Sequence, residues 1–492
     1  MNDMLYNILI KNFEKEKGWV RYQIESFNNF VDFGLQNIIN EIGIVKIVSG
    51  SEDLKIKFGK IEIEKPFVKE ADGSERVIYP NEARLRNLTY IAPIFIELTP
   101  IFNGVQEKPE KVHIGDLPVM VRSKLCTLSG LDEAKLIEVG EDPTDPGGYF
   151  IVNGTERVLV LIEEIASNKP IFEKTEDGGV SVRINSERSG FKQRHLVEMR
   201  PDGVVVISFA NLRRLPIVVL LKALGFENDK EMCDYISNKE SIIKEFYINL
   251  YETDVVTTEE AVDYIGKKLK VTEDYRKERV TQILDRYLLP HIGQSESNRR
   301  QKGLYLARII RKCIAIKLGL APDDDIDHYS NKRLLMSGEL LEQLFRSVLL
   351  GRWGLIAKMT YNYQKLTKRG KSPSLQAIIE ADTVTKQLLS SLATGTWVGG
   401  ATGVSQRLDR ASYIKTISHL RSVLSPLTST QEHFKARQIH PTEWGRICPA
   451  ETPEGSSIGL RKHIALMTEI TPGISEKEFM EISNLIESKV KK

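Results

Sequence analysis

The sequence predicts a mixed α+β chain with several domains, sheet-rich at first and helical later. Up to about residue 210, apolar residues alternate with polar ones in several stretches, as in half-buried strands. Beyond that point, apolar residues recur every three to four positions, as on one face of a helix. The chain has 492 residues, and domains of about 100–200 residues each favour roughly three of them. We therefore expect a multidomain α+β architecture.

The first 100 residues combine a helical start with alternating segments. Residues 1–40 are expected to be helical because apolar side chains recur at helical spacing, at Ile24, Phe27, Val31, Leu35 and Ile38. Residues 54–58 and 61–64 then alternate, and Gly59 and Lys60 lie between them. This pattern predicts a hairpin with a glycine-first turn.

Two further sheet segments follow. Residues 148–152 and 155–160 flank Asn153 and Gly154, a pair that suits a two-residue turn with both residues at positive φ. Residues 170–209 form a third β-rich block with glycine-containing turn signals at 177–179 and 201–203.

Helices are expected in the second half. Residues 298–318 carry one apolar face and stop at Gly319. Two more amphipathic helices are expected at 339–350 and 375–392. After the break at Pro472 and Gly473, a helix-like tail ends in lysines.

Composition excludes several protein classes. The net charge is +2, so any nucleic-acid surface must be local. The four cysteines are far apart, which argues against a zinc site or a disulfide framework and indicates a reducing compartment. The sequence has no apolar run of membrane-spanning length, and its start lacks a signal-peptide layout. We expect a cytoplasmic protein.

Basic residues are dense in two windows. Residues 183–214 hold seven basic and three acidic side chains. A second run surrounds the motif described below, at Arg407, Arg410, Lys415, Arg421, Lys435, Arg437 and Arg446. Such bases either follow phosphates, releasing counterions as they bind, or form solvated faces. The sequence leaves both interpretations open.

Three short motifs have weaker support. Residues 370–372 resemble the end of a phosphate-binding loop, but Lys365 stands where that loop needs glycine. The acidic cluster at 323–328 suits either a divalent cation or, more often, a helix cap paired with nearby bases. The glycine-rich loop 395–403 lacks dinucleotide-binding spacing and could approach a nucleic-acid backbone.

Residues 437–460 are the most informative segment. They are too rich in proline and glycine for a helix or a plain strand, yet they include Trp444, Ile447, Ile458 and Leu460. This composition predicts a shaped loop that apolar residues hold on a core, with charged groups positioned by turns. The alternative is a turn array that only connects two elements.

Within this segment, residues 440–455 (HPTEWGRICPAETPEG) resemble a signature of the second-largest subunit of multisubunit DNA-directed RNA polymerases. Further matching stretches, in family order, are 145–157 (DPGGYFIVNGTER), 324–333 (DDIDHYSNKR), 405–413 (SQRLDRASY) and 417–421 (ISHLR). The residues in these stretches are closer to the archaeal and eukaryotic form of the subunit than to the bacterial one. The resemblance covers the first half of the family and is closest to the archaeal B″ (B double-prime) polypeptide, made where the second-largest subunit is split between two genes. The ordinary start and lysine-rich end favour a gene product over an excised fragment.

The resemblance implies a domain layout. It predicts a protrusion at 15–165 and 326–390, a lobe inserted at 166–325, a fork at 391–470 and the start of a next domain at 471–492. The first fork loop would fall at 395–403, and the second at 424–435. The acidic cluster would then be the return from lobe to protrusion, which favours its structural interpretation.

The resemblance also implies chemistry and site residues. In this family two magnesium ions promote phosphodiester formation, and the residues that bind them belong chiefly to the largest subunit. We therefore expect this chain to bind no metal and not to be catalytic alone. Arg437 would lie near the incoming nucleotide, where its guanidinium could pair with phosphate or carboxylate through two parallel hydrogen bonds. Glu454 would lie near the mobile trigger loop of the largest subunit, while Gln406, Arg410 and Arg421 would line the hybrid side of the fork.

The first expected partner is the B′ (B prime) polypeptide, which is the C-terminal half of the same subunit. The others are the largest subunit, the other polymerase subunits, the DNA template and the RNA–DNA hybrid. No membrane partner is expected. Two alternatives remain at this stage: a free-standing nucleic-acid-binding module, or an assembly scaffold whose loops never approach nucleic acid.

Overall fold

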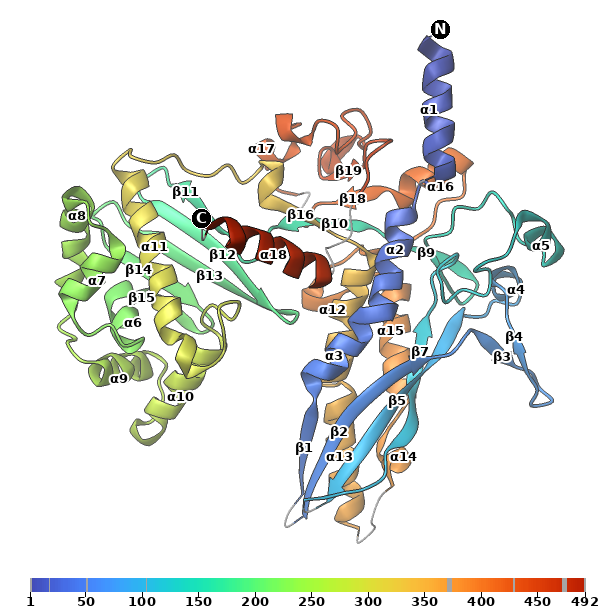
Figure 1. Ribbon diagram of the computed structural model, residues 1–492, viewed down its shortest axis with the longest axis horizontal. Helices are drawn as coiled ribbons and strands as arrows, with labels where there is room; N and C mark the ends of the chain where they lie inside the picture. The colour runs from blue at the N-terminus through green and yellow to red at the C-terminus, as the bar shows by residue number, and fades with distance from the viewer. Residues whose placement is uncertain are drawn as a thin grey trace. The chain divides into compact units, whose positions relative to one another are not determined.

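The computed structural model describes residues 2–16, 18–49, 52–102, 104–369, 374–427, 430–470 and 476–490 (Figure 1). The chain divides into two compact units. Unit 1 comprises Met1–Glu163, Leu334–Ile439 and Glu443–Lys492, and unit 2 comprises Glu164–Arg333 and His440–Thr442. Unit 2 is thus inserted in the sequence of unit 1. Both contain helices and sheets, which confirms the α+β class.

The largest sheet of unit 1 is antiparallel. Its strands are β1 (Ile44–Ser49), β2 (Glu52–Ile63), β5 (Ile91–Phe102), β6 (Val105–Gln106) and β7 (Glu110–Pro118), in the order β1-β2-β5-β6 with β7 also paired to β5. Ile94, Ile96 and Leu98 of β5 are fully buried. They belong to the main hydrophobic core of unit 1, together with residues of the helices that cover the sheet.

The predicted hairpin at 54–64 is wrong, because β2 is one strand that crosses Gly59 and Lys60. Its pairing with β5 shifts by one residue between Phe58 and Ile61, which is a β-bulge. The apolar positions change parity at that point, and a bulge keeps both sets on the buried face. A β-carbon on Gly59 would lie 3.0 Å from the carbonyl oxygen of Glu97, so the bulge brings the backbones close.

The helical start is confirmed, but as several pieces: α1 (Asn2–Glu16), α2 (Arg21–Asn29), a π-helical turn (Phe30–Gly34) and α3 (Leu35–Ile42). Gly18, at φ +68°, follows α1. Phe27, Leu35 and Ile38 are completely buried, as their spacing predicted.

The helices of unit 1 that follow the inserted unit 2 begin with α12 (Ser337–Leu350), α13 (Leu355–Thr367), α14 (Leu375–Ile378) and α15 (Asp382–Thr394). The single helix expected at 375–392 is therefore two helices. Ile379 between them is extended, and the Asn362 side chain donates a hydrogen bond to the Ile378 carbonyl (3.0 Å). This bond replaces one that a continuous helix would have made.

Buried polar groups join α2 to α12. The Gln23 amide, fully buried, donates to the Leu159 carbonyl (3.1 Å) and accepts from the Ser337 backbone (3.1 Å). A β-carbon on Gly338 would lie 2.0 Å from the Ser26 carbonyl oxygen, so only glycine permits this helix crossing.

The predicted second hairpin is confirmed. Strands β8 (Phe150–Val152) and β9 (Thr155–Leu159) are antiparallel, and Asn153 and Gly154 between them have φ of +49° and +71°. Strand β17 (Ser405–Arg407) pairs with β9, so a segment about 250 residues later in the chain extends this sheet.

A second small sheet brings in the C-terminal segment of unit 1. Strand β10 (Leu161–Ile165) runs parallel to β18 (Ser422–Leu424), and β18 pairs antiparallel with β19 (Arg461–His463). These two sheets place residues 405–424 and 461–463 beside the hairpin.

Unit 2 contains a meander of five antiparallel strands: β11 (Pro170–Lys174), β12 (Val180–Arg188), β13 (Phe191–Met199), β14 (Val205–Phe209) and β15 (Leu212–Pro216). The predicted β-rich block is thereby confirmed. Its helices are α6 (Ile217–Ala223), α7 (Asp229–Ile236), α8 (Glu240–Leu250), α9 (Thr258–Lys268), α10 (Glu273–Arg286) and α11 (Arg299–Lys317). The predicted face of α11 is buried in the core of this unit, and Gly319 follows at φ +71°.

The remaining elements are short or terminal: β3 (Phe67–Lys69), β4 (Glu75–Val77), α4 (Pro80–Leu85), α5 (Glu133–Glu138), β16 (Lys332–Leu335), α16 (Tyr413–Leu420), α17 (Phe434–Arg437) and α18 (Glu476–Val490). Among the described residues, no helix is both long and apolar enough to cross a bilayer. The motifs at 370–372 and 472–473 lie outside the described residues.

Candidate functional site

The segment 437–460 is an array of turns, as its composition predicted. It contains two short 3-10 helices, Pro441–Glu443 and Gly455–Ser457, and Gly445, Gly455 and Gly459 adopt positive φ. Of the four apolar side chains that the sequence singled out, two, Ile447 and Leu460, are buried. Trp444 and Ile458 are instead 75% and 49% exposed. The expectation that all four hold the loop on a core is therefore half right.

Arg437 binds the backbone of this array. Its guanidinium donates to the carbonyl oxygens of Ser456 (2.6 Å) and Ile458 (2.9 Å). It also donates to those of Glu432 (2.8 Å) and Gln431 (3.1 Å). The resemblance implied that the Arg437 guanidinium pairs with phosphate or carboxylate. Within this chain its N–H groups instead donate to carbonyl oxygens. Arg437 thus joins two turns that lie about 25 residues apart.

The Thr452 hydroxyl adds a second connection. It donates to the Arg461 carbonyl (2.9 Å) and accepts from the Gly459 backbone (2.9 Å). Glu454, two residues later, precedes the short helix at Gly455–Ser457. Its side chain is exposed and has no hydrogen-bond or ion-pair partner among the described residues, so its carboxylate is available to another molecule.

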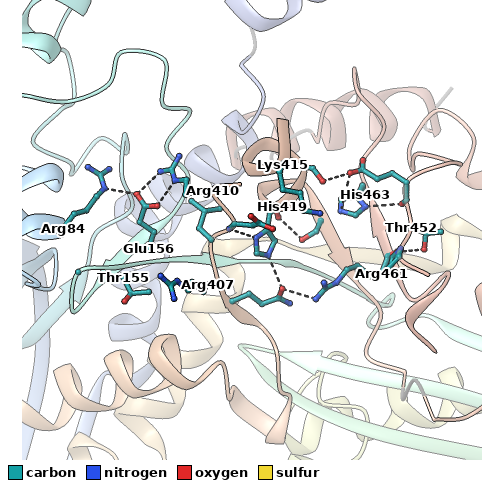
Figure 2. Close-up of a pocket in the computed structure, with 18 of the residues that line it drawn as sticks. Arg84, Thr155, Glu156, Arg407, Arg410, Lys415, His419, Thr452, Arg461 and His463 are labelled. Atoms are coloured by element: carbon teal, nitrogen blue, oxygen red, sulfur yellow. Dashed lines mark hydrogen bonds and ion pairs between the residues drawn. The ribbon is translucent and has the colours of Figure 1, made fainter. Parts of the chain in front are cut away.

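A cavity of about 1160 Å³ adjoins this array in unit 1 (Figure 2). The hairpin loop, the 406–422 segment and the 450–463 segment form its walls, which the two small sheets bring together. Five of its lining residues are lysine or arginine and three are acidic: Arg84, Arg407, Arg410, Lys415 and Arg461, with Glu156, Asp409 and Glu451.

Gln406 lies in this cavity, and three hydrogen bonds fix its amide. Its oxygen accepts from Arg461 (3.0 Å) and from Nε2 of His419 (3.1 Å), and its nitrogen donates to the Gly403 carbonyl (2.9 Å). Nδ1 of His419 accepts from the Asp409 backbone (3.2 Å), so the hydrogen of the neutral ring is on Nε2.

Electrostatics keep the His419 ring neutral. Burial, reinforced by the nearby positive charge of Arg461, lowers the pKa of His419 to about 4. Burial also lowers the pKa of His463, which lines the same cavity. At neutral pH the positive charge of the cavity therefore comes from its lysine and arginine side chains.

Arg410 also lines the cavity, but carboxylates engage it. It bonds Glu156 (2.7 and 2.8 Å) and Asp145 (2.8 Å), and its guanidinium carbon lies 4.9 Å from the centre of the Tyr149 ring. Although burial works in the opposite direction, hydrogen bonds from Arg410 and the charges of Arg410 and Arg84 hold the pKa of Glu156 below its ordinary value. Both partners are therefore ionised at neutral pH.

Arg407 and Lys415 differ from Arg410. Both are exposed in the cavity wall, and neither side chain has an ion-pair or hydrogen-bond partner in the described parts of the chain. Figure 2 shows the Arg407 guanidinium apart from the network that joins Arg84, Glu156 and Arg410. These two side chains supply positive charge that no described residue neutralises.

Arg421 is buried in this structure. The resemblance implied that it lines the hybrid side of the fork, and the residue is 4% exposed within this chain. Its guanidinium donates to the carbonyl oxygens of Trp19 (2.7 Å), Ala465 (2.7 Å) and Leu466 (3.0 Å). Arg421 therefore joins the N-terminal helices to the segment after β19. Its guanidinium is directed into the protein.

A buried cluster of charged side chains contacts the turn array on its interior side. Lys462 of β19 donates to Glu443 (2.5 Å) and Glu163 (3.4 Å), and all three residues are at most 6% exposed. The cluster joins the turn array to β10. Sequence reasoning missed it because 299 residues separate Glu163 from Lys462.

The acidic cluster of unit 2 has basic partners. Asp324 accepts from Lys312 (3.0 Å), Asp325 from His440 (2.9 Å) and Asp327 from Lys332 (3.2 Å). Across the described ranges, no three His, Cys, Asp or Glu side chains are grouped as a metal site requires. The contacts of this cluster are those of a charge-paired turn.

Comparison with known families decides the assignment. The RNA polymerase beta subunit family matches residues 18–386, and RNA polymerase Rpb2, domain 3, matches residues 406–470. The chain belongs to the RNA polymerase beta subunit family. Within that family it corresponds to the N-terminal half of the second-largest subunit, a component of DNA-directed RNA polymerase that acts within the complex.

Similar proteins of this family come from archaea. DNA-directed RNA polymerase subunit Rpo2N of Methanocaldococcus jannaschii is 41% identical over 489 residues, covering 96% of this chain and 97% of that protein. Rpo2N of Methanothermobacter thermautotrophicus strain Delta H is 42% identical, with 96% of each chain covered. Subunit Rpo2 of Saccharolobus shibatae is 42% identical, covering 95% of this chain but only 42% of that longer protein.

The fold of this polymerase chain brings some of the predicted site residues together and separates others. Gln406 and Arg410 share the cavity, while Arg437 and Glu454 belong to the turn array. The loop at 395–403 is partly anchored, since the Trp397 indole is buried and donates to the Leu340 carbonyl (3.0 Å). Trp397 is therefore not exposed for stacking on a base.

Proposed function

We propose that this chain is the B″ polypeptide, the N-terminal part of a second-largest polymerase subunit made as two chains. Its support is the contrast in coverage: the chain accounts for 97% of the Methanocaldococcus Rpo2N protein but 42% of the Saccharolobus Rpo2 chain. The partners in this proposal are the C-terminal part B′, the largest subunit, the other subunits, the DNA template and the RNA–DNA hybrid. We place the complex in the cytoplasm.

We assign the protrusion and the fork to unit 1 and the lobe to unit 2. The boundaries at Glu163 and Arg333 support the assignment, since unit 2 begins and returns near the ends of the expected lobe, 166–325. Residues 440–442 also belong to unit 2. In this proposal the glycine-rich loop 395–403 and residues 424–435 are the two fork loops.

The proposed contribution of this chain to RNA synthesis is electrostatic and positional. The observation that carries it is the cavity beside the turn array, where Arg407 and Lys415 have no neutralising partner among the described residues. Unneutralised bases attract phosphate groups and release counterions when they bind them. Gln406, oriented by three hydrogen bonds, contributes a fixed amide beside them.

Other proposed roles follow from the geometry of the turn array. Arg437 holds residues 431–432 against 456–458, so it positions the end of the second fork loop. Glu454 offers a free carboxylate to the largest subunit. Arg421 stabilises the fork through its buried hydrogen bond to the Trp19 carbonyl. Arg410 links the fork to the hairpin through its ion pair with Glu156.

The magnesium ions of the assembled enzyme stabilise the attacking and leaving oxygens of nucleotide transfer. We assign them to other chains. The carboxylates at the cavity do not form a free ligand set here: Glu156 is ion-paired with arginine, and Glu451 accepts from Ser418 (2.5 Å).

The test is the salt dependence of template binding by reconstituted polymerase containing Arg407→Ala and Lys415→Ala together. Each lost phosphate contact should reduce the slope of log K against log salt by about 0.7–0.9. The matched control is Lys60→Ala with Lys386→Ala, two exposed lysines of unit 1 that lie outside the cavity. An unchanged slope in the cavity variant would refute the proposed contact. Failure of the wild-type chain to assemble would refute the assignment to a polymerase complex.

A further inference from the structure

The C-terminal helix α18 has an apolar face that the described residues of the chain leave exposed. Phe479, Ile482, Leu485 and Ile486 are 60%, 46%, 59% and 58% exposed. Positions three, four and seven residues apart share one side of a helix, so these four residues form a continuous stripe. Asn484 and Ser488 lie on the opposite side, which also carries the exposed Met480.

Such a stripe indicates a contact with another molecule. An amphipathic helix is stabilised mainly by burying its apolar face, since an isolated helix of about 15 residues is marginal in water. A soluble protein rarely leaves a row of large apolar side chains exposed unless it is an interaction surface. Phe, Ile and Leu at this spacing are the anchors used when a helix occupies a hydrophobic groove.

The family comparison identifies the occupant. More than half of the Saccharolobus Rpo2 chain lies beyond its match to this protein, and this protein is the N-terminal half. In that relative, the part that matches this chain and the remainder of the subunit are joined in one polypeptide. A subunit made as two chains lacks this covalent link and requires a non-covalent contact between its two parts.

We infer that the apolar face of α18 is a docking surface for the C-terminal part of the same subunit, supplied as a separate polypeptide. The inference rests on the proposed function, since it requires a subunit in two pieces. It specifies the element of this chain that holds them together and the chemistry of its partner, an apolar groove that accepts Phe479, Ile482, Leu485 and Ile486.

The experiment co-expresses the full chain, carrying an affinity tag, with the C-terminal polypeptide of the same organism, and measures how much of that polypeptide is retained. The test variant is Ile482→Lys with Ile486→Lys. The matched control is Asn484→Lys with Ser488→Lys, which adds the same charge at the same spacing on the opposite face. All four side chains lie at the surface, so neither variant removes core packing, and far-UV circular dichroism should confirm that both are folded.

The control should retain the C-terminal polypeptide as well as wild type does, and the test variant should retain less than a tenth of it. Equal retention by the test variant would overturn the docking role while leaving the two-chain subunit intact. Failure of the wild-type chain to retain the polypeptide would overturn the two-chain proposal and this inference with it. Sedimentation showing that α18 pairs with a second copy of this chain, through the same residues, would also overturn the inference.

Discussion

Gly459 lies directly against the backbone of Arg437: a β-carbon on Gly459 would fall 2.3 Å from the Arg437 carbonyl oxygen. The Arg437 guanidinium meanwhile bonds the carbonyl groups of Ser456 and Ile458, so the two segments are joined by both backbone packing and side-chain bonds. The shape of the turn array depends on this one close approach.

Gly459→Ala should therefore destabilise the array beyond the cost of its backbone conformation. Gly459 has φ +71°, where a non-glycine residue costs about 1–2 kcal/mol, and the clash with Arg437 adds to it. Gly455→Ala is the matched control, since Gly455 has φ +77° but open space around its α-carbon. Urea unfolding of both variants should show the larger loss for Gly459. Equal losses would mean that the 437–459 contact does not contribute.

Arg437→Ala should slow elongation by reconstituted polymerase at limiting nucleotide while leaving subunit assembly intact. The variant removes four bonds to carbonyl groups, so residues 431–432 are no longer held beside 456–458. Arg437→Lys should restore little, because one ammonium group cannot reproduce the planar fork. Limited proteolysis should show faster cleavage in 431–437 in both variants. Elongation at the wild-type rate in Arg437→Ala would contradict the role.

Lys462→Met should be strongly destabilising. It removes the cation that the buried carboxylates of Glu443 and Glu163 share, and breaking a buried pair in this way costs about 3–5 kcal/mol. Lys386→Met serves as the control, because its ion pair with Asp382 is solvent-exposed and should matter little. Comparable denaturation midpoints for the two variants would show that the buried cluster is not required for stability.

The stability of unit 1 should fall as the pH drops below about 6.5. The pKa of His419 is lowered to about 4 in the folded protein, so between pH 6.5 and 4 the unfolded chain binds more protons, and acid favours unfolding. Protonation would also place a hydrogen on Nδ1 and break its bond from the Asp409 backbone. His419→Gln, which cannot titrate, should lose less stability over this interval in thermal unfolding. Identical pH profiles would refute the assignment.

Local patterns explain where the sequence succeeded. The turn at Asn153 and Gly154 and the buried face of α11 follow from short-range conformational preferences and periodicity, and both are confirmed. The prediction of a hairpin at 54–64 was wrong because a glycine between two alternating stretches fits either a turn or a bulge. Pairing with β5, about 40 residues away in the chain, makes it a bulge.

The site was predicted less completely. Gln406 and Arg410 do lie in one cavity, but Arg421 is internal. Arg407 and Lys415, which have no partner among the described residues, could not be told from their paired neighbours. An arginine that binds phosphate and one that binds carbonyl groups look alike in a sequence. Their surroundings, supplied by distant segments, distinguish them.

By itself, the sequence determined the α+β class, the polymerase family and the position of the long helix α11, because each depends on contiguous residues or short-range spacing. Only the tertiary structure decided that the Arg437 fork binds carbonyl groups, that Arg421 reaches the Trp19 carbonyl across 402 residues, and that Lys462 lies buried between two carboxylates. Those contacts join segments that are distant in the chain, in two of the three cases by hundreds of residues. Their energies depend on burial and geometry, which no local pattern in the chain encodes.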